Sequence, residues 1–173
     1  MLRSGLTAPL DAAGGRWRMA YVDAVREWVA AGQAAWLPIR GASMEPAIPD
    51  GSRLLVVARP ASAIGPGALV VFEREGRLVC HRVLGRHRPA GERVFLVKGD
   101  ARPRFDPWVP ETHVLAEVIA IEHDGHRLDL TAPRRRARAR AAAAWSWLRG
   151  GSGTLGRRIA RWCRPGAWRV PVS

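Results

Sequence analysis

Cysteine is scarce in this chain, which has only Cys80 and Cys163 among 173 residues. Two thiols so far apart do not form a disulfide framework, and they are too few for a zinc site built on thiolates. Cys80 lies beside His81 in an apolar stretch, so we expect the two side chains on opposite faces of a strand, with Cys80 in the core. The remaining histidines follow no metal-ligand spacing. The sequence therefore predicts no cofactor and no metal.

Long hydrophobic runs are also missing, although hydrophobic residues make up 47% of the chain. A membrane-spanning helix needs about 18 to 20 consecutive apolar residues, and no such window occurs. The first fifteen residues have no apolar central region, so they do not resemble a secretory signal. We therefore expect a cytoplasmic protein with one folded domain, whose contact with a membrane would be peripheral.

Acidic residues are absent from the C-terminal part of the chain. All fifteen lie before residue 131, whereas residues 133–173 hold eleven arginines and so carry +11 of the net charge of +13. Tryptophans accompany these arginines, and Arg with Trp is typical of a segment that touches anionic lipid at headgroup level. Nucleic acid is a weaker candidate because no DNA- or RNA-binding motif is present. The alternative is a biased tail without a binding function.

The pattern of apolar residues predicts a mainly β fold. Residues 16–31 place Val22, Val25 and Val29 on one helical face, which favours packing of this helix on the core. Short strands separated by turn residues then predict a coiled, barrel-like β domain. The expected strands are residues 36–40, 53–58, 68–74, 77–84, 93–98, 113–122 and 126–130. Three regions follow from this pattern: 1–35 with the helix, 36–130 with the sheet, and 131–173 as a separate basic tail, partly helical at most.

A serine, a histidine and two aspartates stand in or beside these strands. Ser43 follows the first strand between Gly41 and Pro46, and His81 lies inside an alternating run. Asp100 comes after a strand, and Asp106 is six residues further on. A serine hydroxyl becomes a good nucleophile only when a base takes its proton, and the base works best when a carboxylate fixes its tautomer. The sequence thus holds the three parts of a hydrolytic triad, with either aspartate as the third part.

These motifs resemble those of the type I signal peptidases. Residues 41–51 (GASMEPAIPDG) resemble the nucleophile box of that family, and residues 67–72 (GALVVF) resemble the strand that follows it. Residues 81–83 (HRV) and 95–100 (FLVKGD) resemble the boxes of the endoplasmic-reticulum and archaeal branch. That branch uses histidine where most bacterial signal peptidases, and the self-cleaving repressors, use lysine. The resemblance extends over about residues 37–121.

The resemblance implies a role for each residue. Ser43 is the nucleophile and His81 is the base. Asp106 orients His81, because the motif places the triad carboxylate six residues after the Lys-Gly-Asp aspartate, and Asp100 supports the site. Lys98 is expected to be structural. The implied fold is the coiled β domain of the signal peptidases, in agreement with the strand pattern.

The expected function is therefore that of a serine endopeptidase of signal-peptidase type, which would cleave a peptide or precursor protein through an acyl-enzyme on Ser43. Such an enzyme binds an extended peptide along a sheet edge. Two alternatives stay open: a regulator that resembles the self-cleaving repressors, and a catalytically silent peptide-binding module. The expected partners are a peptide substrate and, through the basic tail, a membrane surface, whereas nucleic acid is not expected.

Overall fold

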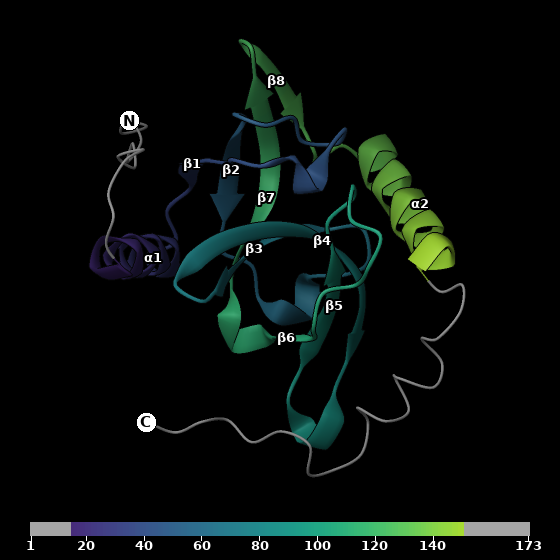
Figure 1. Cartoon of the computed structure of the whole chain (residues 1–173), viewed down its shortest axis with the longest axis horizontal. Helices are drawn as coiled ribbons and strands as arrows, with labels where there is room; N and C mark the ends of the chain where they lie inside the picture. Colours follow the sequence, from purple (N-terminus) through teal and green to yellow (C-terminus); the bar gives the residue numbers. More distant parts are fainter. Residues whose placement is uncertain (1–14, 151–173) are drawn as a thin grey trace.

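The computed structural model describes residues 15–150, in which one antiparallel sheet lies between two helices (Figure 1). The helices are α1 (Gly15–Ala30) and α2 (Pro133–Gly150). The strands are β1 (Ala35–Pro38), β2 (Arg53–Val57), β3 (Leu69–Arg74), β4 (Arg77–His87), β5 (Val94–Lys98), β6 (Val109–Pro110), β7 (Val114–His123) and β8 (His126–Asp129). The mainly β prediction is confirmed, including the N-terminal helix.

Strand β7 organises the sheet, whose order is β1-β2-β7-β3-β4-β5-β6. One edge of β7 pairs with β2, and the other pairs with β3 near its start and with β8 near its end. The register shifts between Leu55 and Val56 in β2 and between Val71 and Phe72 in β3. Such bulges bend and twist strands, so they help the sheet to coil around a core.

Two hairpins turn where the sequence places them. The β3–β4 turn is Glu75-Gly76, with φ of 53° and 69°, and the β7–β8 turn is Asp124-Gly125, with φ of 47° and 75°. Two consecutive residues with positive φ match the right-handed twist of the flanking strands. The β3–β4 turn fixes the register that aligns His81 with Val70.

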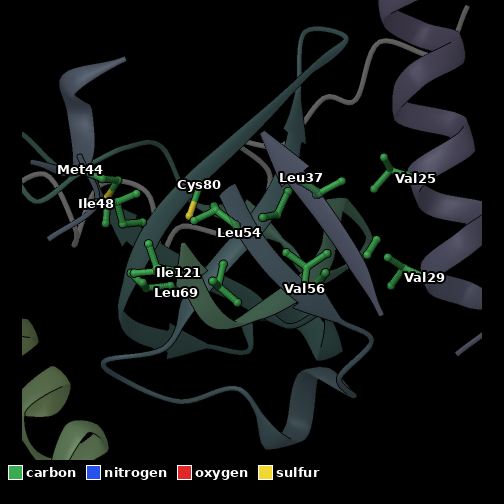
Figure 2. Close-up of a cluster of buried hydrophobic side chains, with 14 residues drawn as sticks. Val25, Val29, Leu37, Met44, Ile48, Leu54, Val56, Leu69, Cys80 and Ile121 are labelled. Atoms are coloured by element: carbon green, nitrogen blue, oxygen red, sulfur yellow. The ribbon is translucent and has the colours of Figure 1, made fainter. Parts of the chain in front are cut away.

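Helix α1 packs on the core, as its valine stripe predicts. Val22, Val25 and Val29 are buried, and Val25 and Val29 belong to the same cluster as Leu37 of β1. Figure 2 shows Val25 and Val29 on the helix facing Leu37 and Val56 of the sheet. This cluster also contains Met44 and Cys80. The core therefore supports the segment of Ser43 through its neighbour Met44.

Helix α2 lies against the other side of the sheet (Figure 1). Ala143 and Ser146 are buried, and Ala143 packs with Leu84 of β4 and Leu96 of β5. Lys98 Nζ donates a hydrogen bond to Ser146 Oγ at 2.9 Å. The first part of the predicted basic tail is therefore a helix docked on the sheet, while the domain boundary at residue 131 stays a prediction.

Residues 1–14 and 151–173 lie outside the described part, and with them the rest of the predicted tail. Within residues 15–150, no helix combines the length and the hydropathy that a membrane span requires.

Candidate active site

Ser43 lies in a short 3-10 turn, Ala42–Met44, between β1 and β2. Gly41 precedes the turn with φ 103° and ψ 149°, a conformation that side chains with a Cβ rarely adopt. Its N–H donates to Asp50 Oδ1 at 2.7 Å, and the Ser43 carbonyl accepts from Ala101 N–H at 3.0 Å. Met44 is buried in the core. These contacts hold the turn from both sides and leave Ser43 itself partly exposed.

His81 lies within hydrogen-bonding reach of Ser43. Its Nε2 is 3.4 Å from Ser43 Oγ, a long contact of the kind that often tightens only when substrate binds. The ring is buried and meets the ring of Phe72 edge-on, with centroids 5.9 Å apart. The neighbouring Cys80 is buried, as predicted, in the cluster that also contains Val25 and Leu37, and burial raises the pKa of its thiol to about 12. Cys80 therefore stays protonated and does not compete as a nucleophile.

Asp106 contacts the other nitrogen of His81. Asp106 Oδ2 lies 2.5 Å from His81 Nδ1, and Asp106 Oδ1 accepts a hydrogen bond from Arg74 Nη1 at 3.0 Å. The Asp106 N–H donates to the Val97 carbonyl at 3.1 Å, which ties the loop after β5 back to that strand. The carboxylate is thus held by two side chains, and the backbone of the same residue by one further hydrogen bond.

The environment of Asp106 favours its charged form. Burial acts to raise the pKa of the carboxyl, but the hydrogen bond and charge of His81, together with those of Arg74, outweigh burial and hold the pKa below its ordinary value. An ionised Asp106 accepts the Nδ1 proton of His81. Nε2 is then free to accept the proton of Ser43 Oγ. An imidazole with its own proton on Nδ1 is the tautomer that a general base needs here.

Asp100 lies nearby but faces a different partner. Arg82 Nε and Nη2 donate to its two carboxylate oxygens at 2.9 and 2.6 Å, and Arg82 Nη1 donates to the Gly67 carbonyl at 3.1 Å. The Asp100 N–H contacts Met44 Sδ at 3.4 Å. The geometry therefore places Asp106, and not Asp100, against His81. Asp100 holds the turn after β5 beside the serine segment.

Gly99 shows how tightly that turn is packed. A Cβ at this position would lie 2.6 Å from the Ser43 carbonyl oxygen and 3.0 Å from His81 Nε2. Only glycine leaves room for the turn to press against both residues. Lys98, the residue before it, is buried and bonded to Ser146, in keeping with the structural role expected for it.

Three residues of this arrangement were not predicted as site residues: Arg74, Arg82 and Asp50. Arg74 could have been found, because the hairpin turn aligns Val70 with His81 and the two-residue period of β3 then places Arg74 on the face of His81. The pairing of Arg82 with Asp100 depends on the β4–β5 register, which includes a bulge between Val83 and Gly85. No local signal reveals that register.

A second serine–histidine pair lies elsewhere. Ser52 Oγ is 3.2 Å from His123 Nδ1, and His123 Nε2 is 3.3 Å from Asp124 Oδ2. Ser52 is fully buried and already donates its proton to the Pro49 carbonyl at 2.6 Å. A hydroxyl that cannot meet a substrate has a structural role. Among residues 15–150, no group of three or more His, Cys, Asp or Glu side chains could hold a metal ion.

Comparison with known families places this arrangement in context. The family model described as Peptidase S24-like matches residues 10–97. The matched segment runs from before α1 to Val97 in β5, so it contains Ser43 and His81 and ends before Asp100 and Asp106. A search of curated proteins found no match.

Proposed function

Since the chain belongs to the Peptidase S24-like family, we propose that it is a serine endopeptidase of signal-peptidase type. The family includes both signal-peptidase-type proteases and self-cleaving repressors. The observation that carries the proposal is the row of contacts from Ser43 Oγ through both nitrogens of His81 to Asp106, at 3.4 and 2.5 Å. Ser43 is the nucleophile, His81 the general base and Asp106 the residue that orients it.

The reaction follows from these positions. His81 Nε2 takes the proton of Ser43 Oγ as the oxygen attacks the carbonyl carbon of the scissile peptide bond. The imidazolium, stabilised by ionised Asp106, then protonates the leaving amine, and an acyl-enzyme on Ser43 remains. A water molecule, deprotonated by His81, hydrolyses the ester and restores the serine. Asp100 contributes indirectly, because its pairing with Arg82 fixes the turn against Ser43.

The residue type of the base favours a place for this chain in the histidine-using branch of the signal peptidases. His81 occupies the position at which the lysine-using members have their base. Lys98 lies at the end of β5, and its ammonium group is hydrogen-bonded to Ser146 of α2. Because the ammonium group is buried and hydrogen-bonded to α2, a structural role for Lys98 is favoured.

A sheet edge without a strand partner, next to the serine in the described part of the chain, suits an extended substrate. β1 leads directly into the Ser43 turn and pairs with β2 on one edge. In the described part of the chain, no strand pairs with its other edge. Backbone groups on such an edge can add a peptide as a further strand, so the scissile bond would enter in line with the residue that attacks it.

Peptide cleavage by point variants tests the proposal. Wild type, Ser43→Ala and His81→Ala are incubated with a library of precursor peptides, and products are identified by mass spectrometry. Ser52→Ala is the matched control, because it removes another serine that contacts a histidine. We expect cleavage by wild type and by Ser52→Ala only. Equal cleavage by Ser43→Ala would end the serine-protease hypothesis.

The same samples separate the alternatives. A self-cleaving regulator would lose mass on storage in a Ser43-dependent manner while leaving added peptides intact. A silent module would bind peptides without cleaving either the library or itself.

A further inference from the structure

Helix α2 exposes an unusual combination of side chains. It contains six arginines and no acidic residue, and Trp145 and Trp147 are two of the large apolar side chains that the structure leaves exposed. Trp145 is 61% exposed. An indole left in water on a docked helix is not explained by the packing of the helix on the sheet.

The exposed side chains form a stripe. Ala143 and Ser146 mark the face that packs on the sheet. At 100° per residue, Arg134, Arg138, Ala141 and Trp145 lie at intervals of four, three and four residues on the opposite face, and all four are exposed. We call these four residues the Arg–Trp stripe. It runs along the outer surface of α2, away from the core.

A groove between α2 and the sheet is also lined by arginines, including Arg138 of the stripe. Its volume is about 480 Å³, and Arg135, Arg136 and Arg140 of α2 line one wall. Apolar side chains, among them Ile119 and Leu128, also line the groove. Among the described residues that line it, the one acid is Glu117, which is paired with Arg59 at 3.1 Å. The positive charge of α2 is therefore not neutralised from within the groove.

We propose that the outer face of α2 binds the surface of an anionic lipid bilayer. Guanidinium groups pair with lipid phosphates, and tryptophan favours the headgroup level, where its ring is buried and its N–H stays hydrated. Nucleic acid would also attract the arginines. The apolar side chains that line the groove favour lipid, because acyl chains use apolar surface that a phosphodiester backbone does not. This surface does not depend on the peptidase assignment.

The attachment of α2 gives the proposal a spatial consequence. Ser146 on α2 is bonded to Lys98, and Lys98 immediately precedes Gly99, which packs against Ser43 and His81. The helix that binds the bilayer through its outer face would thus also contact, through Lys98, the strand that leads to the candidate active site.

Vesicle binding of the full-length chain tests the surface. The Ser43→Ala protein, which cannot digest itself or a substrate, is mixed with vesicles of phosphatidylcholine alone or with added phosphatidylglycerol, and binding is measured by flotation. We expect binding only to the anionic vesicles, and weaker binding at high salt. Adding Arg134→Ala and Arg138→Ala should lower the partition coefficient roughly fivefold per arginine.

Two further variants complete the experiment. Trp145→Ala should weaken binding without changing the net charge. Arg26→Ala with Arg77→Ala removes the same charge as the stripe variant from exposed sites outside α2 and should retain nearly wild-type binding. Equal binding by the stripe variant and this control would overturn the proposal. So would the absence of vesicle binding, or release of the protein from vesicles by an equal charge of single-stranded DNA.

Discussion

Replacing Gly99 by alanine should separate the position of the catalytic pair from the stability of the fold. The new Cβ would lie 2.6 Å from the Ser43 carbonyl oxygen, whereas close carbon–oxygen contacts in proteins are about 3.3 Å or longer. To restore an ordinary contact, the serine segment or the turn after β5 must therefore move by ~0.7 Å. The Cβ would also lie 3.0 Å from His81 Nε2, the atom that receives the serine proton.

A displacement of this size is costly for catalysis. Moving a reacting group by about 1 Å can lower the rate about 100-fold, so we expect Gly99→Ala to lose roughly 10- to 100-fold in kcat/KM. Overpacking of this kind destabilises a protein by about 1–3 kcal/mol, so the variant should remain folded at 25 °C if the wild type has ordinary stability. Peptide cleavage and urea unfolding are measured on the same preparation.

Gly85→Ala is the matched control. A Cβ at Gly85 would meet no atom within 4 Å, and this glycine has no positive φ. We expect near wild-type activity and stability. If Gly99→Ala cleaves peptide as fast as Gly85→Ala, the turn after β5 does not set the distance between Ser43 and His81, and the reasoning fails.

Four other substitutions have distinct expected outcomes. Asp106→Asn should lower kcat about 10³- to 10⁴-fold, because the amide cannot stabilise the His81 imidazolium. Asp100→Asn should lower kcat less than about tenfold and should mainly reduce the stability of the fold, by about 1–3 kcal/mol. Comparable kcat losses in the two would contradict the geometry. Arg74→Ala removes an interaction that lowers the pKa of Asp106, so the acidic limb of kcat/KM and the acid-unfolding midpoint should both shift to higher pH; an unshifted profile would argue against the contact. Gly41→Ala should cost about 1–3 kcal/mol through backbone strain alone, since its Cβ would meet no atom within 4 Å at φ 103°, and an unchanged urea midpoint would refute this.

The pH dependence has a definite sign. The folded-state pKa of Asp106 lies below its ordinary value, so the carboxylate stabilises the fold above that ordinary value. This contribution decreases as the pH falls through the folded-state pKa. Removing Arg74 brings the two values closer together, so the contribution is smaller and its loss is complete at a higher pH.

Local pattern predicts much of this fold. The strands from β1 to β5 and both hairpins follow from alternating apolar residues and from Glu75-Gly76 and Asp124-Gly125, because these signals are contained within a few residues. The valine stripe of α1 likewise predicts the face that packs on the core. The strand pattern does not predict β6, because a strand of two residues, Val109–Pro110, is too short to show any period.

The candidate site is predictable to a smaller extent. Ser43 and His81 stand in motifs, and the structure brings both within contact distance of one another, with Asp106 on the far side of the imidazole. The arginine partners depend on which strands lie side by side. β7 pairs with β2 and β3, far from it in sequence, and α2 docks through a contact between Lys98 and Ser146. Contacts of this range leave no trace in local periodicity.

Each aspartate near the serine has its own arginine. Arg74 neutralises Asp106 and Arg82 neutralises Asp100, so the two acids nearest the serine are paired, whereas α2 contains six arginines and no acidic residue of its own. Ionic strength should therefore separate two properties of one molecule. Cleavage of a small uncharged peptide in solution should vary little between low and high salt, while attachment to an anionic bilayer should weaken steeply over the same range.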